Sequence, residues 1–160
     1  MKILEQIPLA PLTTFGIGGP ARRFVEATGE DEIAEAVAWA KQSGTPLFVL
    51  GGGSNLLVSD RGFDGLVLKI ALRGISVADA DWPGEAILSA AAGEEWEHCV
   101  RRSLEADLAG LECLAGIPGT VGGTPVQNVG AYGQEVASVI ERVRAFDRSE
   151  ARFVEFTNPE

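Results

Sequence analysis

The sequence predicts an α+β fold, and three patterns along the chain carry that prediction. A segment with helical periodicity lies between two short apolar runs, a second such segment follows another apolar run, and two further runs near the end flank a polar turn. Apolar residues spaced by three and four indicate a buried helix face, whereas short apolar runs between turn residues indicate strands. The chain therefore mixes helices with several short strands.

The first pattern is a helix over residues 31–43 between candidate strands at 22–27 and 47–50. Acidic residues fill its first turn, and Gly44 then Pro46 follow its last turn, as is typical of helix ends. This order predicts a β-α-β unit. The apolar face of this helix consists of Ile33, Ala36, Val37 and Ala40.

The second helix is expected over residues 94–108, after a candidate strand at 85–91. Its apolar face is expected to consist of Trp96, Cys99, Val100 and Leu104. With 160 residues, the chain can form one domain or two small lobes that share a core. The remaining candidate strands are 65–70, 73–78 and the two arms of a hairpin, 139–146 and 151–156.

Charge and cysteine content exclude several classes of function. The net charge of −10 makes nucleic acid and anionic membranes poor partners, so we expect neither. The two cysteines show no paired spacing, which indicates neither a zinc site nor a disulfide framework and suits a reduced compartment. The sequence shows no signal peptide and no apolar run of membrane-spanning length, so we expect a cytoplasmic protein without membrane insertion.

The stretch GGGSN at residues 51–55 is the first candidate binding site. A dinucleotide fingerprint is disfavoured because Leu56 stands where its third glycine belongs, and a phosphate-binding P-loop lacks its Lys-Ser or Lys-Thr. Consecutive backbone N–H groups, with the Ser54 hydroxyl and the Asn55 amide, can instead form a nest for a phosphate or pyrophosphate. Because the chain has only three lysines, we expect backbone groups to capture the anion. A tight turn without a ligand is the alternative.

A second glycine-rich segment covers residues 115–133. Its glycines and prolines suit neither a stable helix nor a central strand, while Ile117, Val121 and Val126 are apolar, which predicts a buried loop. A buried loop must satisfy its backbone polar groups, and a large flat ligand with donors and acceptors would do so. A glycine-rich connector is the alternative. Further side-chain hydrogen bonds are available from Gln127, Asn128 and Tyr132.

The titratable residues elsewhere carry weaker signals. His98, the single histidine, is expected on the solvated face of the second helix, where no catalytic triad can be assembled around it. Cys99 and Cys113 suit core or boundary positions. Glu94 and Glu95 suit the positive end of a helix dipole, and we assign them no chemistry.

Four motifs follow one another in a fixed order along the chain. They are TTFGIGGPA at 13–21, LGGGSNLLVSD at 50–60, AGEEW at 92–96 and GLECLAGIPGTVGGTPVQNVGAYGQEV at 110–136. Together they resemble the UDP-N-acetylenolpyruvoylglucosamine reductase family, flavin enzymes of peptidoglycan precursor synthesis. The resemblance implies a vanillyl-alcohol-oxidase/PCMH-type FAD-binding domain of two α+β lobes, which we expect at residues 1–70 and 71–160.

By this resemblance, residues 51–55 take the pyrophosphate of FAD, and the second glycine-rich segment lines the cofactor near the flavin ring. Related oxidases attach the flavin through a histidine in or near this turn, where Ser54 and Asn55 stand here, so FAD is expected to bind non-covalently. The implied cofactor-binding residues are Gly51, Gly52, Gly53, Ser54, Asn55, Gly116, Ile117, Pro118, Gly119, Thr120, Gly122, Gly123, Gln127, Asn128, Gly130, Ala131 and Tyr132.

The implied reaction uses NADPH to reduce the flavin, which then reduces a UDP-sugar, UDP-N-acetylglucosamine enolpyruvate, to UDP-N-acetylmuramate. The arginine, serine and glutamate that catalyse it in the family match no residue of this chain, and we expect them downstream of Glu160 in a C-terminal substrate domain. Two alternatives stay open: a sugar or lactone oxidase of the same fold, and a flavin-binding module that is inactive as the isolated fragment.

Overall fold

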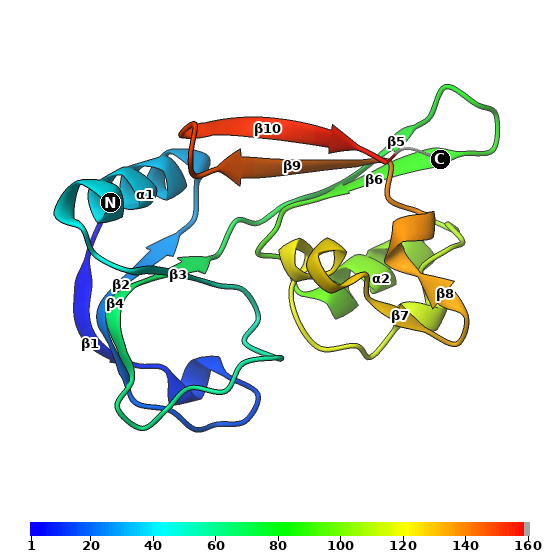
Figure 1. Cartoon of the computed structure of the whole chain (residues 1–160). Coiled ribbons are helices and arrows are strands. Elements are labelled where there is room, and N and C mark those ends of the chain that lie inside the picture. Colours follow the sequence, from blue (N-terminus) through cyan, green and yellow to red (C-terminus); the bar gives the residue numbers. More distant parts are fainter. Residues whose placement is uncertain (159–160) are drawn as a thin grey trace.

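A computed structural model describes residues 1–158 and shows a sheet covered by one helix, a second lobe of short elements, and a hairpin that spans both (Figure 1). The four-stranded sheet has the order β1-β2-β4-β3. Strands β2 and β3 both pair in parallel with β4, and β1 pairs antiparallel with β2. Its elements are β1 (Leu4–Pro8), β2 (Pro20–Ala27), α1 (Glu30–Ser43), β3 (Leu47–Leu50) and β4 (Phe63–Ile70).

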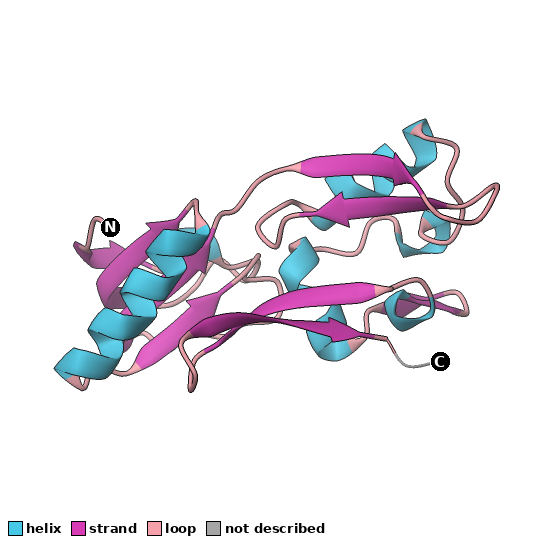
Figure 2. Cartoon of the chain, turned by 90° about the horizontal axis from the view of Figure 1, so that it is seen from above, coloured by secondary structure: helices cyan, strands magenta, loops and turns pink. Residues whose placement is uncertain are grey.

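The predicted β-α-β unit is present as β2, α1 and β3, but β4 lies between its two strands. Helix α1 has acidic residues in its first turn and ends at Gly44, which adopts the left-handed conformation that glycine tolerates best. Figure 2 shows α1 lying across one face of the sheet. Strand β4 is an inner strand, and its residues 66–68 are buried on both faces of the sheet, which explains why three apolar residues follow one another there.

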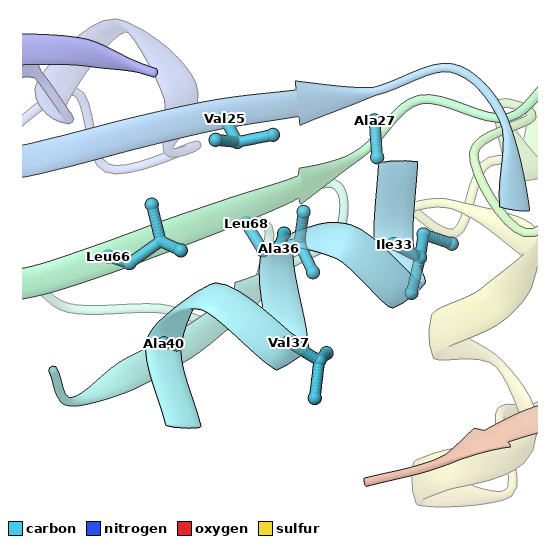
Figure 3. Close-up of a cluster of buried hydrophobic side chains, with 8 residues drawn as sticks. All are labelled: Val25, Ala27, Ile33, Ala36, Val37, Ala40, Leu66 and Leu68. Carbon is cyan, nitrogen blue, oxygen red and sulfur yellow. The ribbon is translucent and has the colours of Figure 1, made fainter. Parts of the chain in front are cut away.

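The predicted apolar face of α1 is buried against alternate residues of β2 and β4 (Figure 3). On the opposite face of the sheet, Phe24 and Val67 join a second cluster with Leu9, Ala21 and Leu50. Because side chains alternate along a strand, neighbouring residues of β4 serve different cores. The cluster in Figure 3 consists of Val25, Ala27, Ile33, Ala36, Val37, Ala40, Leu66 and Leu68.

The second lobe packs a core around helix α2 (Trp96–Glu105). This helix is shorter than predicted, because Glu95 before it is extended and Asp107 takes a positive φ of 54° just beyond its end. Leu104, predicted to be on the buried face, is 49% exposed at the last turn. The buried residues of this core are Trp96, Cys99, Val100, Leu114, Val129 and Val136.

The other elements of this lobe are short. Strand β5 (Ile75–Asp79) pairs antiparallel with β6 (Ala86–Ala90), and the two-residue strands β7 (Gly130–Ala131) and β8 (Gln134–Glu135) pair with each other. Single 3₁₀ turns connect them, and neither these turns nor β1, β7 and β8 were predicted from sequence. The turns, including one in the first lobe, are η1 (Ala10–Leu12), η2 (Glu112–Leu114), η3 (Val121–Gly123), η4 (Pro125–Gln127) and η5 (Val136–Ser138).

The predicted terminal hairpin is formed by β9 (Arg142–Asp147) and β10 (Arg152–Thr157). Its first strand begins later than expected, because residues 136–138 form η5. Near the hairpin turn, Phe146 packs against the core of the first lobe and Arg144 pairs with Glu30 of α1 at 2.6 Å. The hairpin therefore contacts the first lobe, and the lobe boundary at residues 70 and 71 stays a prediction.

Candidate functional site

The two glycine-rich segments meet in space. An ideal Cβ built on Gly52 would lie 2.7 Å from the Cα of Gly119, and one built on Gly119 would lie 3.2 Å from Ser54 Oγ. Asn55 Nδ2 also donates a hydrogen bond to Gln127 Oε1 at 3.2 Å. In Figure 1 the loop between β3 and β4 reaches toward the loops that follow α2. The structure thus brings the two predicted segments together.

Contacts within the chain explain part of why glycine occupies these positions. Gly53 has a φ of 68°, and a Cβ there would overlap the carbonyl oxygen of Leu12. The Gly53 carbonyl accepts a hydrogen bond from the Thr14 N–H at 3.1 Å. Gly52 and Gly53 are therefore required by close backbone packing, whether or not a ligand is bound.

The backbone N–H groups of residues 51–55 are available to a ligand. Within residues 1–158, no hydrogen bond uses any of these five groups as its donor. Gly53 is buried, and a buried N–H group needs an acceptor. A row of N–H groups without protein acceptors on a glycine turn is the geometry that binds phosphate oxygens. This observation fits the predicted anion nest.

A lysine also stands at this turn, where the sequence analysis expected backbone N–H groups, with Ser54 and Asn55, to capture an anion. The Nζ atom of Lys69, on β4, donates a hydrogen bond to the carbonyl oxygen of Gly51. Lys69 is half-buried, and this burial lowers the pKa of its ammonium group. Sequence reasoning missed this residue because its position depends on β4 lying beside β3.

The AGEEW motif holds the second glycine segment through its backbone. The N–H of Val121 donates to the Glu94 carbonyl and the N–H of Gly122 donates to the Ala92 carbonyl, each at 2.9 Å. The Trp96 N–H donates in turn to the Gly119 carbonyl at 3.0 Å. The motif at 92–96 thus positions the segment at 119–122.

Side chains of α2 fix the start of this segment. The indole Nε1 of Trp96 donates to the Leu114 carbonyl at 2.9 Å, in the core of the second lobe. The Glu97 carboxylate accepts the Gly116 N–H at 2.7 Å. Helix α2 therefore supports the glycine loop from both its backbone and its side chains, which explains why the two motifs occur together.

Glu94 is a buried acidic residue whose role the sequence analysis missed. Its carboxylate accepts the Gly74 N–H at 2.6 Å, and it lies 3.4 Å from Arg73 Nη1 and 3.3 Å from His98 Nδ1. The Gly74 hydrogen bond, followed by the His98 and Arg73 contacts, lowers the pKa of Glu94 despite its burial. His98 itself is about half-exposed, as predicted.

Segment 125–132 is more exposed than the sequence predicted. Val126 is 85% exposed and Tyr132 is 91% exposed, so the buried-loop prediction was wrong at Val126, whereas Ile117 and Val121 are half-buried in the second core. Val126 lies in the 3₁₀ turn η4 and Tyr132 in the turn between β7 and β8, and little of either side chain is covered by the described residues. The exposed candidate residues are Gly52, Asn55, Gly116, Pro118, Gly122, Gln127, Asn128, Gly130 and Tyr132.

The Asn128 side chain is occupied within the chain. Its Nδ2 donates to Glu135 Oε2 at 2.8 Å, and its Oδ1 accepts the Ala137 N–H at 3.1 Å. Asn128 adopts a φ of 42°, which asparagine tolerates better than most residues. Its amide therefore shapes the loop, and Gln127 is the side chain of this pair that faces the first segment.

Other classes of site find no support in the described part of the chain. Residues 1–158 contain no group of three metal-ligating side chains and no helix long and apolar enough to cross a bilayer. Both cysteines are free thiols, and burial raises the pKa of Cys99 to about 11, as for a core thiol.

Comparison with known families then decides the class. Residues 21–156 match the family model described as an FAD binding domain. This chain belongs to the FAD-binding domain family. The fold class expected from the resemblance is thereby confirmed, and the two facing segments lie within the matched region of this FAD-binding domain.

Curated relatives share a more specific name. UDP-N-acetylenolpyruvoylglucosamine reductases of Streptomyces coelicolor and Cutibacterium acnes are 52% and 51% identical over 97% and 90% of this chain. The chain spans 39% and 38% of their respective lengths. The resemblance to this reductase family is confirmed, and the chain corresponds to about two fifths of such a protein.

Solved structures agree on the fold. The UDP-N-acetylenolpyruvylglucosamine reductase of Thermus caldophilus matches 99% of this FAD-binding domain with a TM-score of 0.77 and 30% identity, and 53% of that chain is covered. A solvent-stable cholesterol oxidase matches 98% of the domain with a TM-score of 0.72 and 19% identity, and 33% of that chain is covered. The second likeness shows the fold alone.

Proposed function

We propose that this FAD-binding domain is part of a cytoplasmic flavoenzyme that uses NADPH to reduce UDP-N-acetylglucosamine enolpyruvate to UDP-N-acetylmuramate. The observation that carries the proposal is the row of backbone N–H groups at residues 51–55, which have no acceptor within residues 1–158 and lie on a turn that packs against the second glycine segment. The identity of 52% to a curated reductase supports the choice of reaction.

The residues present fit FAD. The turn at 51–55 would hold the pyrophosphate through backbone N–H groups, with Ser54 and Asn55 adding side-chain donors. The second segment would line the rest of the cofactor, and a Cβ on Gly123 would meet no protein atom within 4 Å, so this backbone is open to close approach. Bound FAD would supply the hydride transfer, and the chain would bind and orient the cofactor.

We further propose that the FAD is held without a covalent bond. The turn presents Ser54 and Asn55, neither of which forms the histidine linkage of related oxidases. The histidine of this chain, His98, lies on α2 against Glu94. Binding through hydrogen bonds alone makes cofactor retention depend on the geometry of both loops.

Two alternatives are distinguished by the same assay. In a sugar or lactone oxidase of this fold, the substrate would reduce the flavin and oxygen would reoxidise it. The similarity to curated reductases favours reduction of the enolpyruvyl sugar instead. A flavin-binding module would hold FAD without a response to NADPH. The expected lack of turnover by the isolated 160-residue chain stays a prediction, as does the position of the catalytic arginine, serine and glutamate.

The test begins with the purified protein and FAD. We expect stoichiometric, dialysable FAD binding by the 160-residue chain. In a protein extended to the length of the reductases, NADPH should bleach the visible flavin band and the enolpyruvyl substrate should restore it. Failure of the 160-residue chain to bind FAD would contradict the proposal. Bleaching without recovery on addition of the substrate would contradict the proposed reaction while leaving FAD binding intact.

A further inference from the structure

Lys69 is placed by the sheet beside the proposed pyrophosphate turn. It pairs in register with Leu50, the last residue of β3, so its side chain starts next to the point where the glycine turn begins. Its Nζ atom donates to the Gly51 carbonyl oxygen. An inner strand of the sheet therefore places a cation at the glycine turn.

This hydrogen bond fixes the orientation of a peptide group. In a trans peptide, the C=O of one residue and the N–H of the next point in opposite directions in one plane. Anchoring the Gly51 carbonyl to Lys69 therefore directs the Gly52 N–H to the side away from Lys69. Successive glycines would otherwise sample many conformations, at an entropic cost when a ligand orders them.

The charge of Lys69 also matters for an anionic ligand. The chain has a net charge of −10, which disfavours the approach of a pyrophosphate. The charged groups that act on Lys69 are Glu26 of β2, Glu95 before α2 and Arg73. The two carboxylates favour the ammonium form, while burial and Arg73 oppose it. Because the Gly52 N–H points away from Lys69, the ammonium group favours an anion at this turn through its positive charge and not through a direct hydrogen bond.

We infer that Lys69 is a positioning residue of the pyrophosphate site, which holds the Gly51 carbonyl, directs the Gly52 N–H to the opposite side of the peptide, and adds a positive charge to the turn. This inference rests on the proposed FAD function. It adds to the site a side chain from the central strand of the sheet, outside both glycine segments.

The test compares FAD affinity, by quenching of flavin fluorescence, in Lys69→Met, Lys69→Arg and the control Lys41→Met. Removal of the charge in Lys69→Met should weaken FAD binding about 10- to 100-fold, as expected for a hydrogen bond to a charged group. Lys69→Arg should keep most of the affinity. The control changes an exposed lysine on α1 and should bind FAD like the unaltered protein.

A pH series separates the charge of Lys69 from a purely structural role. FAD affinity of the unaltered protein should fall as pH rises toward the lysine pKa, which burial holds below its usual value of about 10.4. Lys69→Arg should lack this fall, because its guanidinium stays protonated. If Lys69→Met does not fold, the comparison of Lys69→Arg with the unaltered protein still tests whether the charge of Lys69 favours FAD binding.

Two results would overturn the inference while leaving the proposed function standing. One is a Lys69→Met protein that binds FAD as tightly as the unaltered protein. The other is an identical fall with pH in Lys69→Arg and in the unaltered protein. Absence of FAD binding by the unaltered protein would overturn the proposed function and this inference together.

Discussion

Gly52 and Gly119 pack backbone against backbone, so that a Cβ on Gly52 would lie 2.7 Å from Gly119 Cα and 3.1 Å from the Thr120 nitrogen. Residues that are far apart in the sequence therefore close one side of the candidate site. This contact joins the two glycine-rich segments, and it is possible only because Gly52 has no side chain.

Gly52→Ala should push the two segments apart. We expect a loss of about 1 to 3 kcal/mol in the free energy of unfolding, typical of overpacking, because the clash is with backbone that has no rotamer to change. FAD binding should weaken as well. Urea unfolding and FAD titration measure the two effects, and an unchanged unfolding curve would show that the close contact does not exist in solution.

Gly123→Ala is the counterpart of Gly52→Ala, because it should change FAD affinity without changing the stability of the protein. The added methyl group would meet no protein atom within 4 Å, and the φ of Gly123 lies outside the positive range that disfavours alanine. The unfolding free energy without FAD should therefore stay within about 0.5 kcal/mol of the unaltered value. FAD affinity should fall if the cofactor passes over this residue. Equal FAD affinity would remove Gly123 from the proposed site.

The side chains of Ser54 and Asn55 should contribute to binding beyond the backbone. Their joint replacement by alanine should cost roughly 1.5 to 3 kcal/mol of FAD affinity for each charge-assisted hydrogen bond lost. Asn55 Nδ2 already donates to Gln127, so the loss also loosens the link between the segments. Calorimetric titration tests this, with Ser149→Ala in the distant hairpin turn as the control. Unchanged affinity of the double variant would leave the backbone alone responsible.

The stability of the second lobe should depend on the ionisation of Glu94. Because the folded state lowers its pKa, the stabilisation is present above the unfolded-state pKa of about 4.3 and is lost as pH falls through the folded-state value. Glu94→Gln should cost about 1 to 3 kcal/mol near neutral pH, because the Gly74 N–H and Arg73 lose a charged acceptor.

Denaturant unfolding at a series of pH values measures this effect. The difference between Glu94→Gln and the unaltered protein should shrink as the pH is lowered below about 4.3. Glu105→Gln removes a carboxylate from an exposed ion pair on the same helix and should change stability little. A constant difference between pH 7 and acid conditions would mean that the charge of Glu94 is not what stabilises the lobe.

Local patterns predicted most of the regular structure, because periodicity and end signals are properties of neighbouring residues. The face of α1, the strand Leu47–Leu50 and the terminal hairpin are examples. The same reasoning failed at the end of α2. The helix was predicted to continue to residue 108, but it ends at Glu105, and Asp107 takes a positive φ just beyond it. Strands of two residues, such as β7, are too short to leave a pattern.

The candidate site was predicted only where its residues are neighbours in the sequence. Glycine clustering marked both segments, but contacts between distant residues were invisible to it. Lys69 reaches the turn only because β4 inserts between β2 and β3, and the carboxylate of the buried Glu94 meets the Gly74 N–H, which lies 20 residues earlier in the chain. Val126 is likewise exposed in the 3₁₀ turn η4, although its apolar side chain indicated burial.

Amide hydrogen exchange with and without FAD tests most directly whether the two glycine segments bind one cofactor. The N–H groups of residues 51–55 have no acceptor within the described chain, so they should exchange rapidly in the absence of FAD. Saturating FAD should slow exchange in peptides that cover residues 51–55 and 116–123 together, with the same dependence on FAD concentration. Protection of only one segment, or of neither, would contradict the account.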